Sequence, residues 1–188
     1  IRLLRARGNA MQNAVPKGEG GMAAVLGSTV DIIEKILEEN QKNFTVQIAN
    51  DNSEGQIVLS GKIIDLEKLI EILKSKKIKN VKLPVSAPFH SNLMGEATKV
   101  MKNEIEKTNF QDSKTILISN VTAKEIANKE DLKKLLIEQI ESRVRWRESV
   151  LNMINEGTNQ FIEIGPGKVL SGLVKRIDKN VNINTINT

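Results

Sequence analysis

The sequence predicts an α/β protein with two parts of different pattern. Residues 20–86 give apolar and amphipathic segments in the order strand, helix, strand, strand, helix, strand. After His90 the pattern changes to helices alternating with strands, which is typical of a mainly parallel sheet covered by helices. A chain of 188 residues can bury one good core, or two small subdomains that share an interface. We therefore expect two structural units.

The first unit is defined by four expected strands and two expected helices. The strands lie at residues 22–26, 45–49, 56–61 and 81–85. The helices carry apolar residues at helical spacing, namely Ile32, Ile33, Ile36 and Leu37 in the first and Leu66, Leu69, Ile70 and Leu73 in the second. Ser28 or Thr29 can cap the first helix, and the polar run 50–55 is expected to turn between two antiparallel strands. This βαββαβ order is the split-βαβ, or ferredoxin-like, motif.

The second unit is expected to alternate between helices and strands. Helices are expected at residues 93–108, 132–140, 146–155 and 169–177, and strands at residues 115–119, 161–164 and 183–186. Only three strands are visible, so we expect the first half of this parallel sheet to be missing. The start of the chain agrees, because Leu3, Leu4, Ala10 and Met11 have near-helical spacing without a preceding N-cap.

Composition argues against several classes of protein. The chain has no cysteine and one histidine, which excludes disulfides and a thiolate nucleophile and argues against any metal site. No apolar stretch approaches the roughly 20 residues that span a bilayer, and the basic N-terminus lacks the apolar region of a signal peptide. We therefore expect a cytoplasmic protein with no membrane partner.

The net charge of +5 favours an anionic partner. Nucleic acid is disfavoured, because four Phe, one Trp and no Tyr leave few side chains for base stacking and no nucleic-acid motif is present. A phosphorylated cofactor or an acidic protein stays open, as does a solvated lysine-rich surface that binds nothing.

His90 is the candidate catalytic residue. It is the only histidine, and it stands in the run 84–91, where Pro84 and Pro88 restrict the backbone before an expected helix. An imidazole held in one direction is suited to act as a general base. The alternative is a histidine that caps a helix or is exposed on a loop.

Four segments together resemble the malonyl-CoA:acyl carrier protein transacylase family. They are RGNAMQ at 7–12, the run 50–61, SAPFHS at 86–91 and EIGPGKVL at 163–170. The resemblance implies part of an α/β-hydrolase-like acyltransferase domain, formed by residues 1–16 and 87–188. It also implies a ferredoxin-like (βαββαβ) subdomain inserted at residues 17–86, which agrees with the order of elements expected above.

The family's reaction is a ping-pong transfer of malonyl from coenzyme A to the phosphopantetheine thiol of acyl carrier protein in fatty acid biosynthesis. It proceeds through a malonyl-serine ester. The resemblance therefore implies two substrates, malonyl-CoA and phosphopantetheinylated acyl carrier protein, and no permanently bound cofactor. It makes His90 the base that activates the serine.

The resemblance gives roles to three further residues. Arg7 matches the arginine whose guanidinium binds the free carboxylate of malonyl through two parallel donors. Gln139 matches the residue whose backbone carbonyl orients the imidazole. Phe89 gives modest support for malonyl as the acyl group, because a bulky aromatic precedes the histidine in malonyl-selective relatives. An aromatic that fills the seam between the subdomains fits Phe89 equally well.

One part of the family's pattern is absent from the sequence. The family nucleophile lies in a Gly-His-Ser-Leu-Gly turn, whereas Ser60, Ser91 and Ser171 all lack the required flanking glycines. The family places that turn upstream of the arginine, so it would precede Ile1, together with the loop that helps to form the oxyanion hole. We therefore expect a C-terminal portion of such an enzyme, inactive by itself.

Two other interpretations stay open. One is an acyltransferase of polyketide-synthase type, and the other is a catalytically inactive module that binds a carrier protein. The second would use two basic clusters, namely Lys74, Lys76, Lys77 and Lys79, and Arg143, Arg145 and Arg147. The expected partners are acyl carrier protein and a coenzyme A thioester, not nucleic acid or a membrane.

Overall fold

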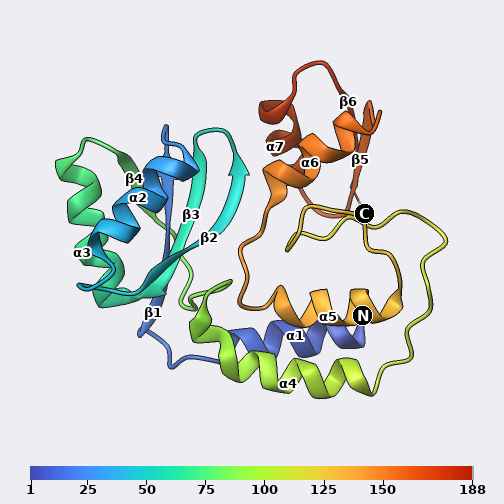
Figure 1. Ribbon diagram of the computed structural model, residues 1–188, viewed down its shortest axis with the longest axis horizontal. Helices are drawn as coiled ribbons and strands as arrows, with labels where there is room; N and C mark the ends of the chain where they lie inside the picture. Colours follow the sequence, from blue (N-terminus) through green and yellow to red (C-terminus); the bar gives the residue numbers. More distant parts are fainter. Residues whose placement is uncertain (188) are drawn as a thin grey trace.

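The computed structural model describes residues 1–187, which form three groups of elements (Figure 1). A four-stranded sheet with two helices lies on one side, a layer of helices lies below it, and a two-stranded sheet with two helices forms the third group. In chain order the elements are α1 (Arg2–Gln12), β1 (Gly20–Leu26), α2 (Val30–Asn40), β2 (Val46–Ser53), β3 (Gln56–Lys62), α3 (Ile63–Ser75), β4 (Lys79–Lys82), a short 3₁₀ helix (Asn92–Met94), α4 (Gly95–Glu106), α5 (Lys129–Glu138), α6 (Trp146–Asn155), β5 (Gln160–Ile164), α7 (Val169–Ile177) and β6 (Asn182–Ile186). Among residues 1–187, none of the helices combines the length and apolar character that a membrane span would need.

Strands β1 to β4 form one antiparallel sheet in the order β2-β3-β1-β4. β1 lies between β3 and β4, and β2 pairs with β3 across a tight turn at Glu54 and Gly55. The predicted order of strands and helices is therefore present, and the predicted antiparallel pairing across the turn is confirmed.

Two predicted strand boundaries in this sheet are wrong. β2 continues to Ser53, so most of the polar run that predicts a turn is strand. The reason is that the carboxylate of Asp51 is buried and paired with Arg147, so a polar residue faces the interior here. β4 ends at Lys82 and does not reach residue 85, because Pro84 has no N–H to donate to a neighbouring strand.

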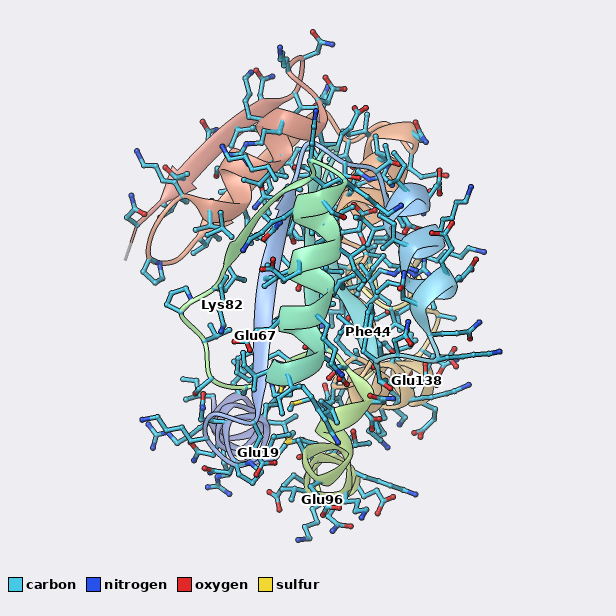
Figure 2. All side chains as sticks on the ribbon, turned by 90° about the vertical axis from the view of Figure 1, so that its left-hand side faces the viewer. Glu19, Phe44, Glu67, Lys82, Glu96 and Glu138 are labelled. Carbon is cyan, nitrogen blue, oxygen red and sulfur yellow. The ribbon has the colours of Figure 1, made fainter. Side chains whose placement is uncertain are left out.

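The core of this unit lies between one face of the sheet and the helices α2 and α3, which both cover that face. The buried apolar residues from the helices and strands are Ile33, Ile36, Leu66, Leu69, Leu73, Ala23, Val25, Val46, Ile48, Ile57 and Leu59. Of the two predicted capping residues, Thr29 is the N-cap of α2, because its side chain accepts a hydrogen bond from the N–H of Ile32. Figure 2 shows α3 in front of the sheet, where Lys82 of β4 pairs with Glu67 at 2.8 Å.

The helices α1, α4 and α5 lie side by side as a helical layer (Figure 1). Their shared core consists of Met11, Met94, Ala97, Met101, Ile105 and Ile140. α5 begins earlier than predicted, because the side chain of Asn128 accepts from the N–H groups of Glu130 and Asp131. It also ends earlier, at Glu138, and the carbonyl groups of a last helical turn have no partner within the helix. The carbonyl of Gln139, the C-cap residue, is therefore available to another group.

The third group contains the parallel strands β5 and β6, packed against α6 and α7. Both helices occupy the predicted residues. The predicted strand at 115–119 is wrong, because Ile118 forms only an isolated bridge with Glu125 and Ile116 is exposed. A strand requires a partner along its length, and none pairs with this segment among residues 1–187. Arg176 of α7 donates a hydrogen bond to Gln56 and so connects this group to the four-stranded sheet.

Candidate active site

His90 lies in a turn between β4 and the short 3₁₀ helix. Its backbone φ is 56°, in the left-handed region that costs a residue with a side chain on the order of 1 kcal/mol. Two hydrogen bonds hold this turn. The Oγ of Ser91 donates to the carbonyl of Pro88 at 2.7 Å, and Oε1 of Gln47 on β2 accepts from the N–H of Asn92 at 2.7 Å. Backbone strain persists where the surrounding structure enforces it, and such positions cluster at functional sites.

The turn also lies directly against β1. A Cβ atom at Gly20 would overlap the ring of Pro88, so only glycine lets the proline approach the strand this closely. Ala87 and Ser91 are buried on either side of this contact. His90 is thus anchored to the sheet by the residues immediately before and after it.

The imidazole of His90 is oriented by the helical layer. Its Nδ1 lies 2.9 Å from the main-chain carbonyl oxygen of Gln139, at the C-terminal end of α5. A carbonyl oxygen only accepts, so Nδ1 carries the proton in this bond. In the neutral ring Nε2 then has the lone pair, which is the arrangement that a general base requires.

Burial lowers the pKa of His90 below its ordinary value, and this is the largest influence on it. The hydrogen bond to the carbonyl of Gln139 raises the pKa in part, and the positive charge of Arg7 lowers it again. The ring is therefore neutral near pH 7. The charge of Arg7 thus acts on the imidazole, although α1 and the His90 turn are far apart in the sequence.

Arg7 projects from α1 and is half-buried. Burial lowers its pKa, and among residues 1–187 no carboxylate forms an ion pair with it. At the end of the same helix, Nε2 of Gln12 donates to Oγ of Ser86 at 3.2 Å, which ties α1 to the segment before His90. A half-buried guanidinium without a carboxylate is suited to receive one from a ligand.

His90 lines an open cleft of about 570 Å³. One wall comes from α2 and β2, including Glu34 and Leu37, and the other comes from residues 141–145. Residues 1–187 contain no group of three or more His, Cys, Asp or Glu side chains placed to hold a metal ion. At this cleft His90 can supply proton transfer, whereas Arg7 is not among the residues that line it.

Phe89 lies in the seam between the sheet and the helical layer. It packs against the core of the helical layer and also against the small cluster of Met22, Ala49 and Val58 on the second face of the sheet. This position agrees with the seam-filling interpretation of the aromatic, and nothing among these contacts selects an acyl group.

The arginines of the second basic cluster are ion-paired. Arg143 binds Glu34 of α2 at 2.7 Å, and Arg145 binds Glu148 at 2.9 Å. Arg147 binds Asp51 at 2.9 Å. Arg143 and Arg147 link separate elements, and Arg145 pairs locally at the start of α6, so all three are engaged within the protein, which argues against their use as a free basic surface for a carrier protein.

Sequence reasoning missed Asp51, Arg147 and Gln47 as contributors near the site. Asp51 stands in a polar run that resembles a turn, and Gln47 is one polar residue in an alternating strand. Both contact residues far away in the chain, so no local pattern marks them.

The chain is also similar to known proteins in sequence and in structure. The family model described as "Acyl transferase domain" matches residues 1–186. The malonyl CoA-acyl carrier protein transacylase of Bacillus subtilis is 43% identical over 180 residues, which cover 95% of this chain and 57% of that protein.

Solved structures give the same result. The acyl-carrier-protein-S-malonyltransferase of Bartonella henselae is 45% identical with a TM-score of 0.95, over 100% of this chain and 60% of that one. A malonyl-transacylase in complex with its type II PKS acyl-carrier protein is 32% identical with a TM-score of 0.91, over 100% of this chain and 60% of that one. The chain thus spans about 60% of the length of these two solved relatives.

Proposed function

Because this chain belongs to the acyl transferase domain family, we propose that it supplies the base and the carboxylate anchor of a malonyl-CoA:acyl carrier protein transacylase. The observation that carries the proposal is that the chain contains both a neutral, oriented His90 and a half-buried Arg7 that has no carboxylate partner among residues 1–187. Acyl transfer through a serine requires a base, and anchoring of a free carboxylate is the further task that distinguishes malonyl from acyl groups that lack one.

In the proposed first half-reaction, Nε2 of His90 takes the proton of a serine hydroxyl as the serine oxygen attacks the thioester carbonyl of malonyl-CoA. The carbon–sulfur bond breaks, and the imidazolium returns the proton to the departing coenzyme A thiolate. The malonyl group is then held as a serine ester. We propose that this serine belongs to the portion of the relatives that the chain does not span.

In the second half-reaction, His90 takes the proton of the phosphopantetheine thiol of acyl carrier protein. The thiolate attacks the ester, and the imidazolium protonates the serine oxygen, which restores the starting state. The carbonyl of Gln139 holds the ring in the same orientation through both halves. Arg7 binds the free carboxylate of malonyl throughout, which favours malonyl over acyl groups that lack one.

We further propose the division into residues 17–86 and residues 1–16 with 87–188. The separate apolar cores of the four-stranded sheet and of the helical layer support it. We also propose that the enzyme is cytoplasmic, acts in fatty acid biosynthesis and has no permanently bound cofactor, as expected from the sequence.

A chimera tests the proposed function. Residues 1–188 are joined to the N-terminal part of the Bacillus subtilis relative that lies outside the matched region, and transfer of labelled malonyl to acyl carrier protein is measured. We expect transfer that His90→Asn reduces about a hundredfold or more. A chimera that transfers malonyl equally well with and without His90 would overturn the proposal.

A polyketide-synthase-type function is the second candidate, because one relative is solved with a type II PKS acyl-carrier protein. The same chimera decides between them when it is offered a fatty-acid-type and a polyketide-type carrier protein in equal amounts. The higher identity to the Bacillus subtilis and Bartonella henselae proteins leads us to expect preference for the fatty-acid-type carrier.

A further inference from the structure

Asp51 is a buried carboxylate that the proposed reaction does not use. It lies on β2 with an exposed fraction of 1%, and Nε of Arg147 donates to its two oxygens at 3.0 and 2.9 Å. The Nη2 of Arg147 lies 2.9 Å from Oδ2, so two nitrogens of the guanidinium hold the carboxylate. Removal of Arg147 would leave the carboxylate of Asp51 buried and unpaired, which would strongly destabilise the folded protein. The pair therefore fixes the start of α6 against β2.

A short backbone ladder lies beside this ion pair. The N–H of Val144 donates to the carbonyl of Ala49 at 2.7 Å, and the N–H of Asp51 donates to the carbonyl of Val144 at 2.9 Å. This parallel bridge joins β2 to the connection between α5 and α6, residues 139–145. Asp51 thus contacts this connection through its main chain, and its side chain holds Arg147 in the first turn of α6, directly after the connection.

The same connection carries the carbonyl that binds His90. Gln139 is its first residue, and its Nε2 donates to the carbonyl of Ser142 at 3.1 Å. Ser142 lies two residues before Val144, and the N–H of Ser142 donates to the last residue of α5 at 3.0 Å. Asp51 is therefore linked to the end of α5 through its hydrogen bond with Val144, the main chain of residues 142–144 and the hydrogen bond of Ser142 to Glu138, which directly precedes Gln139.

We propose that Asp51 and Arg147 are positioning residues for His90, which hold the connection 139–145 against β2 and so keep the Gln139 carbonyl in place. Neither side chain has a hydrogen bond to the imidazole among the described residues, so both act through Val144 and Gln139. A carbonyl at a fixed distance keeps the proton on Nδ1 and the lone pair on Nε2. The inference rests on the proposed function, in which Nε2 of His90 is the base.

The single histidine makes a direct test possible on the 188-residue chain. Because no other imidazole is present, the ¹⁵N and ¹H signals of the ring need no assignment by mutation, and they distinguish a proton on Nδ1 from one on Nε2. We expect the wild-type ring to be in the Nδ1–H form, with slow exchange of that proton with water. In Asp51→Asn we expect exchange about tenfold faster and a shift of the neutral ring toward the Nε2–H form.

Asp51→Asn leaves the guanidinium of Arg147 without its carboxylate partner. The double variant Asp51→Asn/Arg147→Gln removes both charges, so it keeps the test valid if the single change unfolds the protein. We expect its ring signals to match those of Asp51→Asn, since the two residues act as one unit. Two controls separate positioning from general stability. Ile57→Val removes buried volume from the sheet core, and Glu67→Gln removes an exposed ion pair with Lys82.

Neither control is expected to change the tautomer or the exchange of the Nδ1 proton. The inference fails if the double variant keeps wild-type ring signals, or if Ile57→Val changes them to the same extent. The measurement involves no acyl transfer, so such a result would leave the proposed function standing. Failure of the proposed function would instead appear as an active chimera that does not need His90.

Discussion

Nδ1 of His90 and the main-chain carbonyl oxygen of Gln139 lie 2.9 Å apart, although one belongs to the turn after β4 and the other to the end of α5. A carbonyl orients the ring without bringing a full negative charge. A carboxylate in the same place would raise the pKa of the imidazole more strongly. With a carbonyl partner, burial and the charge of Arg7 keep the net effect downward. The result is a ring that is oriented, neutral and free to accept a proton.

The first prediction concerns the pH dependence of stability. Burial holds the pKa of folded His90 below its ordinary value of about 6.5, so the unfolded chain binds a proton first as the pH falls. The contribution of the neutral ring to stability is complete above about pH 6.5 and is lost as the pH falls through the folded pKa. We expect urea unfolding of the wild type to lose more free energy between about pH 7 and about pH 5 than His90→Asn does.

Asparagine is the suitable replacement at position 90, because it tolerates a positive φ better than most residues. Parallel pH profiles for the wild type and His90→Asn would show that His90 titrates normally in the folded protein and would contradict the prediction.

The second prediction concerns Gly20. A methyl group at this position would overlap the Pro88 ring, so Gly20→Ala must push the His90 turn away from β1. We expect a loss of about 1–3 kcal/mol in the free energy of unfolding, together with a change in the His90 ring signals. Gly95→Ala is the matched control, since a Cβ there meets nothing within 4 Å, and it is expected to be neutral or slightly stabilising.

The βαββαβ unit could be predicted because its elements are set by local periodicity. Helices α2 and α3 show apolar residues at helical spacing, and all of those named above except Ile32, which is exposed, pack in the core against the sheet. The segment 115–119 misled for the opposite reason. Its apolar residues resemble a strand, but a strand forms only where another strand pairs with it. The sequence of one segment does not show whether such a partner is present.

The candidate site could be predicted only in part. The resemblance pointed to His90, Arg7 and Gln139, and the structure brings the imidazole to the carbonyl of Gln139. The contact of Asp51 with Arg147 could not be predicted, because a polar run in a strand and a turn have similar composition. Only the folded protein shows that one of these polar residues faces inward.

The third prediction concerns the side chain of Gln139. The imidazole binds its main-chain carbonyl, so Gln139→Ala should leave the tautomer of His90 and its titration nearly unchanged. The side chain makes one hydrogen bond of its own, to the carbonyl of Ser142, and its loss should cost about 1 kcal/mol in urea unfolding. A large shift of the His90 titration in this variant would mean that the side chain itself orients the ring.

The fourth prediction concerns acyl selectivity in the chimera. Arg7 is half-buried without a carboxylate partner among residues 1–187, so a malonyl carboxylate would gain a charge-assisted hydrogen bond that acetyl cannot form. We expect Arg7→Ala to reduce malonyl transfer about 10- to 100-fold, in line with ~1.5–3 kcal/mol for such bonds, and to change acetyl transfer little. Equal losses for the two acyl groups would remove Arg7 from the role of selecting the substrate.

The last prediction concerns the 188-residue chain by itself. The three serines considered as alternatives to a family nucleophile are poorly placed for attack. Ser91 is buried and its hydroxyl donates to the carbonyl of Pro88, Ser60 is buried in β3, and the Oγ of Ser171 is buried at the start of α7. None of the three has a hydrogen bond to His90 among the described residues, so none is placed for His90 to activate its hydroxyl.

Incubation with malonyl-CoA followed by intact-mass measurement should therefore show no malonyl adduct on the chain. The chimera should gain one malonyl group under the same conditions, on the serine of its added Gly-x-Ser-x-Gly turn, and Ser→Ala at that turn should abolish it. An adduct on the 188-residue chain that disappears in Ser91→Ala would locate the nucleophile beside His90 itself. The proposal that the serine lies in the portion of the relatives outside this chain would then be wrong.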